Sequence, residues 1–370
     1  MYFHIITTIN CNSECRYCYK KSCNDFGNNL EKKWKFEIVP EKIAYSIDEL
    51  KDFLNRNSSE AKHVLTFYGG EPLLEIDKIK EIMDSINSRY MMQTNGKLLD
   101  KLESVYLDRF DMILVSIDGN QQLTDANRGK GTYDKILSNI SFIRKNGFKG
   151  ELAARMVIDE YSSLMNSVKH LFDVGFDSVH WQIDAGFYAN DFAKRNFADF
   201  IEKYNHEVSE LADFWLEKMK TGKVLKIYPF LGIFDTLYRG KKTKLMCGSG
   251  YANYTIATNG KISVCPIMHD IKDYYVGDIW KSLPEKLPEV RVKGRCTGCE
   301  ILELCGGRCL YANEAELWPK EGQKLICNSV KHLISEIERR LPDISELIER
   351  GVISENQFKY EKYSGPEIIP

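Results

Sequence analysis

The sequence predicts an α/β fold: a partial barrel of six parallel strands and their crossover helices, then a small cysteine-rich domain and C-terminal helices. Three observations predict it. Up to about residue 185, short apolar runs alternate with stretches of helical periodicity. Seven of the eleven cysteines lie between Cys247 and Cys327. Helical periodicity then returns in residues 329–350.

The apolar runs of the first half have the length and composition of buried strands. They cover residues 2–9, 63–68, 90–94, 112–117, 151–158 and 178–183. Helical patterns separate them at residues 46–54, 74–88, 98–106, 133–146 and 162–174. Such alternation predicts parallel strands joined by right-handed crossovers. The active site of such a barrel lies at the C-terminal ends of its strands.

The second half begins with a long predicted helix, residues 197–220. A linker is expected after Pro229, around Gly232 to Lys244. Two further helices are expected at residues 329–340 and 344–350. The predicted domains are therefore a barrel (1–230), a linker (231–246), a cysteine-rich domain (247–330) that metal would have to stabilise, and a helical tail (331–370).

Composition narrows the functional classes. The chain has 370 residues, with 51 Lys and Arg against 53 Asp and Glu, so no nucleic-acid partner is expected. The N-terminus lacks a signal-peptide pattern, and no run of 18 apolar residues indicates a membrane span. We therefore expect a cytoplasmic protein. In that compartment many cysteines indicate metal or redox chemistry, and oxygen-labile clusters would suggest an anaerobic cell.

Three cysteines, Cys11, Cys15 and Cys18, follow the first predicted strand within eight residues. Iron–sulfur clusters are normally held by four thiolates. Three thiolates would hold three irons of a four-iron cluster and leave the fourth iron open to a small molecule. The alternative is a structural zinc site, although zinc usually takes four ligands in two pairs.

This spacing resembles the signature of the radical S-adenosylmethionine (SAM) enzymes. The resemblance implies that the open iron binds the amino and carboxylate groups of SAM. It also implies that one electron from the cluster cleaves SAM to methionine and a 5′-deoxyadenosyl radical, which abstracts hydrogen from a substrate. The protein would supply binding, orientation and exclusion of water.

Motifs at the ends of the next strands strengthen the resemblance. Gly69, Gly70, Glu71 and Pro72 form a Gly-Gly-Glu-Pro run, which in this family holds the methionine amino group. By itself, the run could be an ordinary strand-to-helix turn. The third and fourth strands end in small polar groups, where a ribose and a carboxylate would lie: Thr94, Asn95, Ser116 and Asp118.

Five other residues complete the expected SAM site. Arg128 resembles the family arginine that reaches the cofactor carboxylate. Arg155 lies in an apolar strand and needs an anionic partner, which could be SAM or a barrel carboxylate. Gln182 and Ile183 resemble the segment that supports the adenine, and Tyr17 matches a position beside the adenine.

The other cysteine group resembles the seven-cysteine SPASM domain, which carries two auxiliary four-iron clusters. Its elements are Cys247, a Gly260-x4-Cys265 unit, Cys296-x2-Cys299-x5-Cys305-x3-Cys309, and Cys327. The resemblance assigns Cys296, Cys299, Cys305 and Cys327 to the distal cluster, and Cys247, Cys265 and Cys309 to the nearer one. A zinc ribbon on Cys296, Cys299, Cys305 and Cys309 is the alternative, and it would leave the other three without a role.

Seven cysteines are one short of the eight ligands that two such clusters need. Some relatives carry an extra cysteine where this chain has Asn253. The nearer cluster could therefore have an open iron or a non-cysteine ligand. Residues 254–265 should form a hairpin with a type I′ Asn259-Gly260 turn and Cys265 on its second strand. Cys23 remains as a spare thiol.

Three 4Fe-4S clusters and SAM are thus the expected cofactors, and the expected function is modification of a peptide or protein. A thioether crosslink between a cysteine and a carbon of a ribosomally made peptide is favoured; a carbon–carbon crosslink or an epimerised centre is possible. The alternative is an anaerobic sulfatase maturase that oxidises Cys or Ser to formylglycine. In those enzymes the catalytic aspartate directly follows the Gly-x4-Cys cysteine, where this chain has Pro266, with Asp270 displaced.

A third possibility is an electron carrier or zinc scaffold without enzymatic activity, which would have no use for residues 69–72, Ser116 or Arg128. The expected partners of an enzyme are the peptide and an electron donor such as ferredoxin or flavodoxin. Only ten residues precede Cys11, too few for a winged-helix leader-binding segment. Leader recognition would then use the barrel, the tail after Cys327 or a separate protein. No catalytic residue beyond the cofactor sites is predicted.

Overall fold

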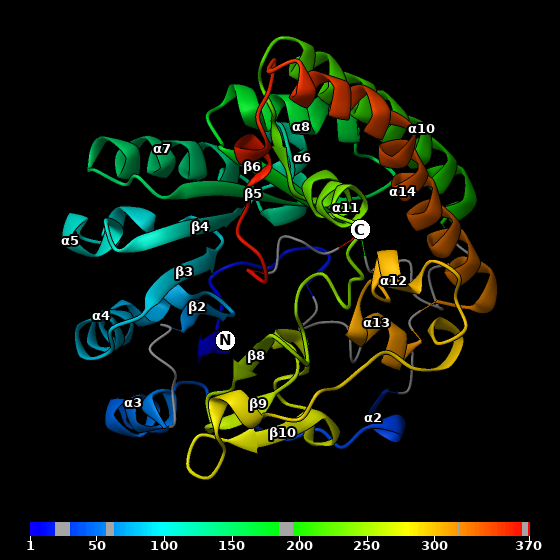
Figure 1. Cartoon of the computed structure of the whole chain (residues 1–370). Helices are drawn as coiled ribbons and strands as arrows, with labels where there is room; N and C mark the ends of the chain where they lie inside the picture. The colour runs from blue at the N-terminus through cyan, green and yellow to red at the C-terminus, as the bar shows by residue number, and fades with distance from the viewer. Residues whose placement is uncertain (19–29, 57–62, 185–194, 317, 365–368) are drawn as a thin grey trace.

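The computed structural model describes residues 1–18, 30–56, 63–184, 195–316, 318–364 and 369–370. Within these ranges, the strands form one sheet in the order β10-β9-β8-β1-β2-β3-β4-β5-β6-β7 (Figure 1). Neighbouring strands from β8 to β7 are parallel, and β9 and β10 are antiparallel additions. The strands are β1 (Tyr2–Thr8), β2 (Val64–Gly69), β3 (Arg89–Thr94), β4 (Phe110–Ser116), β5 (Glu151–Ile158), β6 (Ser178–Ile183), β7 (Lys226–Ile227), β8 (Asn253–Ile256), β9 (Lys261–Ser263) and β10 (Tyr275–Asp278).

Helices cover the outer face of the curved sheet, and the N-terminal cysteine segment leaves β1 near its centre (Figure 1). The predicted α/β partial barrel with C-terminal helices is therefore confirmed. The helices are α2 (Leu30–Lys33), α3 (Ile47–Asn55), α4 (Ile76–Ser85), α5 (Ser104–Leu107), α6 (Gln121–Arg128), α7 (Thr132–Lys145), α8 (Leu164–Asp173), α10 (Phe197–Lys220), α11 (Tyr228–Tyr238), α12 (Leu302–Cys305), α13 (Leu310–Ala315) and α14 (Lys320–Glu349), with short 3-10 turns between them.

Alternation along the strands separates two kinds of packing. Phe3 and Ile5 of β1 belong to the large core beneath the helices. Val64, Met91 and Met112 belong to a second, smaller buried cluster. Since Val64 and Leu65 are consecutive in β2 and lie in different clusters, the second cluster fills the barrel interior. It forms an apolar floor at the N-terminal ends of the strands.

The predicted linker after Pro229 is wrong in part, because residues Tyr228–Tyr238 form helix α11. Proline is well tolerated in the first helical turn, where its missing N–H has no intrahelical partner. Phe230, Leu231 and Phe234 are buried against the barrel. Their burial outweighs the cost of about 1 kcal/mol for Gly232 in a helix.

The tail was predicted as two helices, and it is one. Helix α14 runs from Lys320 to Glu349 with Pro342 inside it, and it contains Cys327. Figure 1 shows α14 lying along α10. Arg340 joins the two helices: its Nε donates to Asp213 Oδ1 of α10 at 3.1 Å, and its Nη1 donates to Glu336 Oε2 within α14 at 2.7 Å. Since Ile344 and Leu347 are buried beyond Pro342, α14 is anchored on both sides of the proline.

Smaller differences have local causes. Residues 98–106 form two short turns instead of one helix, because Leu102 is extended between them. Helix α6 was not predicted, and Asn120 caps it. The hairpin of β8 and β9 is present, but only Gly260 (φ 75°) of its turn pair is left-handed. Ala257 N donates to Lys261 O at 2.9 Å, which makes a three-residue loop, and Cys265 lies beyond β9.

No helix within the described ranges combines the length and the apolar character needed to cross a membrane.

Replacing the exposed Pro342 with alanine should stabilise the protein, because alanine restores an amide donor to the middle of α14. We expect the free energy of unfolding to rise by about 1–3 kcal/mol. Urea unfolding of the cluster-loaded protein under anaerobic conditions measures this. Pro319→Ala at the N-cap of the same helix is the control and should change little. Equal effects of the two substitutions would contradict the argument.

Candidate functional site

The segment that carries Cys11, Cys15 and Cys18 is held to the end of β2 by backbone hydrogen bonds. Gly70 N donates to Thr8 O and Glu71 N donates to Asn10 O, both at 2.9 Å. A Cβ at Gly69 would lie 2.2 Å from Thr8 O, and one at Gly70 would lie 2.1 Å from Asn10 O. Gly69 also has φ 134°. Both glycines are therefore needed for the approach of β2 to the cysteine segment.

Glu71 fixes the ends of β2 and β3 together. Its side chain is fully buried, and its Oε1 accepts from Leu73 N at 3.1 Å and from Thr94 Oγ1 at 2.7 Å. Its Oε2 accepts from Asn95 N at 2.7 Å. Burial raises the pKa of Glu71, and these hydrogen bonds oppose the rise. Three protein donors thus already use the carboxylate expected to face the SAM amino group.

Asn95 continues this network to the cysteine segment. Its Nδ2 donates to Asn12 Oδ1 at 2.6 Å and to Ser13 Oγ at 3.2 Å, and lies 4.0 Å from Cys11 Sγ. The structure therefore brings together Glu71, Thr94, Asn95 and Cys11, as expected for neighbouring strand ends. A change at Glu71 should reach Cys11 through Asn95.

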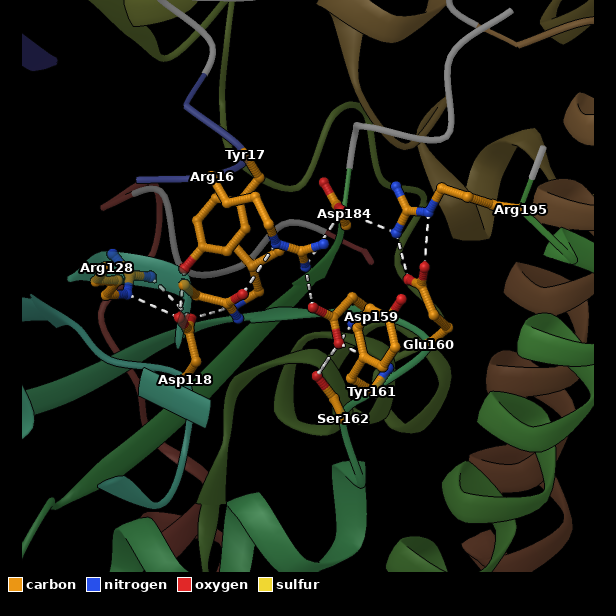
Figure 2. Close-up of polar contacts among 12 residues, drawn as sticks. Arg16, Tyr17, Asp118, Arg128, Asp159, Glu160, Tyr161, Ser162, Asp184 and Arg195 are labelled. Carbon is orange, nitrogen blue, oxygen red and sulfur yellow. Dashed lines mark hydrogen bonds and ion pairs between the residues drawn. The ribbon is translucent and has the colours of Figure 1, made fainter. Parts of the chain in front are cut away.

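A second cluster joins Tyr17, Asp118 and Arg128 (Figure 2). Arg128 Nε donates to Asp118 Oδ2 and Arg128 Nη2 donates to Asp118 Oδ1, each at 2.9 Å. Both side chains are buried. The Tyr17 hydroxyl donates to Asp118 Oδ2, and the Arg128 guanidinium lies 5.3 Å from the Tyr17 ring centre. Burial would lower the pKa of Arg128, but Asp118 raises it above its usual value. Arg128 therefore positions Tyr17 through Asp118.

A third cluster was not predicted from the sequence. Arg16 donates its backbone N to Asn127 O at 2.9 Å, its Nε to Asn127 Oδ1 at 3.1 Å and its Nη2 to Asp159. Figure 2 shows the series continuing through Asp184 and Arg195. Arg195 Nη2 lies 3.3 Å from Asp184 Oδ2. Acidic residues directly after β5 and β6, like Asp118 after β4, are the sequence signal that could have revealed it.

The remaining expected SAM contacts lie in register on adjacent strands. Ser116 on β4 is opposite Arg155 on β5, and Ile183 on β6 is opposite Ile158. Gln182 is opposite Val157 and is half-buried. Burial lowers the pKa of His4 and Arg155 adds to that shift, whereas burial raises the pKa of Tyr68 and Arg155 opposes the rise. Val157 N donates to Asp118 Oδ1 at 3.0 Å, which ties β5 to the second cluster.

None of the described cysteines is in a disulfide. Burial raises the pKa of Cys11 and Cys15, and neighbouring thiols of the N-terminal triad add to both shifts. Such crowding of sulfurs is unfavourable for free thiolates, and a bound metal reverses it by taking up their charge. The triad therefore fits an iron–sulfur cluster by the chemistry of its donors. Cys23 lies outside the described residues.

The other cysteines fall into two electrostatic groups. Burial is the largest cause of the raised pKa of Cys265, and Cys309 and Cys247 raise it further. Burial also raises the pKa of Cys296, to which Cys327 and Cys299 add. Burial raises the pKa of Cys305 to about 12, and Cys296 and Cys327 add to that shift. That each set holds one cluster, as the SPASM resemblance implies, stays a prediction.

Among described residues, no three His, Cys, Asp or Glu groups lie close enough to hold a single metal ion. Each thiolate of a four-iron cluster binds a different iron, so the grouping of the cysteines is compatible with that finding.

A chain of contacts links the nearer group to the barrel interior. The Tyr68 and His4 rings lie 5.4 Å apart, and His4 Nδ1 lies 2.9 Å from Asn253 Oδ1. Asn253 Nδ2 donates to Cys247 O at 3.2 Å. Burial raises the pKa of Tyr68, and both Cys265 and Cys18 contribute to the rise. Contacts through His4 and Asn253 therefore connect Tyr68, near the end of β2, to the backbone of Cys247.

Comparison with known proteins finds a family match that extends from β1 to the end of β5. Residues 5–163 match the Radical SAM superfamily. An uncharacterised protein of Archaeoglobus fulgidus is 24% identical over 87% of this chain and 76% of its own length. The AdoMet-dependent heme synthase of Methanosarcina barkeri is 25% identical over 70% and 81%. The mycofactocin maturase MftC of Mycolicibacterium smegmatis is 23% identical over 76% and 74%.

Solved structures show the same fold over nearly the whole chain. The protein anSMEcpe, solved with bound AdoMet and Cp18Cys peptide, has a TM-score of 0.72 at 19% identity and covers 94% of this chain and 99% of its own. Streptococcus suis SuiB, solved bound to precursor peptide SuiA, has a TM-score of 0.54 at 13% identity, with 83% and 71% covered. The heme synthase and the mycofactocin maturase are named for different products, so similarity to them does not identify the substrate of this chain.

Arg128→Met should destabilise the protein by about 3–5 kcal/mol, because it leaves the buried Asp118 charge without a partner. The double variant Asp118→Asn/Arg128→Met should recover part of this loss, since it contains no unpaired buried charge. Anaerobic urea unfolding of the cluster-loaded proteins measures both. Equal losses in the single and double variants would show that the ion pair is not the source of the effect.

Proposed function

We propose that this enzyme, of which residues 5–163 match the Radical SAM superfamily, modifies a peptide by joining a cysteine sulfur to a carbon atom of a ribosomally made substrate. A carbon–carbon crosslink is the nearest variant of this reaction. The observation that carries the proposal is the series of contacts from β2 to the second cysteine region: the Tyr68 ring lies 5.4 Å from the His4 ring, His4 Nδ1 lies 2.9 Å from Asn253 Oδ1, and Asn253 Nδ2 donates to Cys247 O at 3.2 Å. This series supports a role for the Cys247 region in the same reaction as the N-terminal cysteines.

The N-terminal cysteines Cys11, Cys15 and Cys18 would hold the SAM cluster. When bound, this cluster and SAM supply the electron and the 5′-deoxyadenosyl radical. The chain's own residues fix the site: the backbone bonds at Gly70 and Glu71 hold the cysteine segment, and the Asp118–Arg128 pair orients Tyr17. Ser116, Arg155, Gln182 and Ile183 would complete the contacts to SAM from adjacent strands.

The auxiliary sites support a role for sulfur in the product. Cys296, Cys299, Cys305 and Cys327 would hold one four-iron cluster completely, and Cys247, Cys265 and Cys309 would hold another with one ligand missing. Asn253 does not supply that ligand, because its side chain already bonds His4, Cys247 O and Tyr363 O. Such a centre would supply thiolate binding and electron uptake, which a cysteine crosslink requires.

Formylglycine formation is the alternative reaction, and the overall fold of anSMEcpe is compatible with it. It would need a base at the residue after Cys265, where Pro266 begins a 3-10 turn. Asp270 lies beyond that turn, and burial raises the pKa of its carboxyl group. The absence of a carboxylate directly after Cys265 favours the crosslink.

Cysteine-containing peptides encoded beside the gene provide the test. They would be incubated anaerobically with reconstituted enzyme, SAM and dithionite, and their masses measured. A crosslink removes two hydrogen atoms. Loss of the substrate sulfur would indicate formylglycine, and unchanged mass would contradict crosslinking. Ferredoxin or flavodoxin as natural donor, and a separate leader-binding protein, are further parts of this proposal.

Two cysteine substitutions separate the roles of the clusters. Cys15→Ala should abolish 5′-deoxyadenosine formation, because it removes a ligand of the SAM cluster. Cys299→Ala should retain part of that activity and lose the modified peptide, because it affects only a distal auxiliary ligand. Product analysis by chromatography and mass spectrometry measures both. Full product from Cys299→Ala would contradict a role for auxiliary iron.

A further inference from the structure

A polar groove of about 690 Å³ lies between helices α6 and α8, beside the N-terminal cysteine segment. None of the residues expected to contact SAM lines it. The residues that line it include four with amide side chains, Asn120, Gln122, Asn127 and Asn166, together with Arg16. Each amide carries the same donor and acceptor as a peptide group.

Asn127 provides an independent sign of a ligand. Its side chain is only 4% exposed, and its Oδ1 is taken by Arg16 Nε. Its Nδ2 has no hydrogen-bond partner within the described part of the chain. A buried donor without an acceptor costs about 1–3 kcal/mol. An acceptor brought into the groove, directly or through one water, would remove that cost.

The charges of the groove favour a neutral ligand. Arg16 and Asp159 are the formally charged residues of the wall, and they pair with each other. Asp184 lies a further 4.0 Å from Arg16, so no positive charge is left over for an anion. The ring of Tyr161 is 75% exposed and lies 5.8 Å from the Arg16 guanidinium. It offers an aromatic surface at the groove.

We propose that this groove binds an extended, uncharged stretch of the peptide substrate, and that a main-chain carbonyl of this stretch accepts the hydrogen bond from Asn127. The inference rests on the proposed function, since it assumes a peptide substrate. It places recognition of the peptide beside the N-terminal cysteine segment and away from the residues expected to contact SAM.

The test uses cluster-loaded enzyme and a blocked, neutral hexapeptide of glycine, serine and asparagine, with binding measured anaerobically by ligand-detected NMR titration. Ala126 is an exposed residue of the groove wall, and Ala126→Trp should fill the groove and weaken binding at least about tenfold. Asn127→Asp keeps the acceptor for Arg16 and removes the donor, so it should weaken binding by up to about tenfold. Ser141→Trp, on the exposed face of α7, is the matched control and should bind as the wild type does.

A hexapeptide with glutamate in place of serine should bind no better than the neutral one. Tighter binding of the acidic peptide, no binding to wild type, or binding unchanged by Ala126→Trp would overturn the inference. The same samples are assayed for 5′-deoxyadenosine without peptide, which Ala126→Trp should leave unchanged. If Ala126→Trp loses peptide binding and still forms 5′-deoxyadenosine, the result supports the groove as the peptide site. If the wild-type enzyme binds peptide but forms no 5′-deoxyadenosine, the proposed function is overturned and the groove inference is not.

Discussion

The rest of the site depends on two backbone hydrogen bonds that hold the N-terminal cysteine segment against the end of β2. Gly70 N to Thr8 O and Glu71 N to Asn10 O bring two chain segments, far apart in sequence, closer than any side chain at Gly69 or Gly70 would allow. The glycines act here by removing an obstacle between two parts of the protein. Glu71 and Asn95 then tie the same segment to β3.

The cysteine-rich region extends the barrel sheet. Strand β8 pairs in parallel with β1, and Asn253 at its start bonds both His4 and the backbone of Cys247. The nearer cysteine group therefore takes its position from the strand that also leads to Cys11. Cys247 Sγ also donates to Ser249 Oγ at 3.3 Å, so the thiol has a local hydrogen-bond partner. The N-terminal cysteines and Cys247 are thus both positioned through β1.

Sequence reasoning predicted the elements with strong local signals. Alternation of apolar runs and helical patterns predicted the six barrel strands, whereas the assignment of the cysteines to separate clusters stays a prediction. Sequence reasoning failed where tertiary packing decides the secondary structure. Helix α11 contains Pro229 and Gly232 and is stabilised by buried Phe230. Helix α14 continues through Pro342 because of its contacts with α10. The Arg16–Asp159 pair joins residues far apart in sequence, so the acidic residue after β5 is visible in the sequence but its partner is not.

The central claim is that Cys11, Cys15 and Cys18 leave one iron of their cluster open, and that SAM binds to it. Electron–nuclear double resonance of the dithionite-reduced enzyme, with SAM isotopically labelled at its amino nitrogen, measures this directly. The account predicts a hyperfine coupling between the labelled nitrogen and the reduced cluster. A reduced cluster that shows no such coupling in the presence of saturating SAM would contradict it.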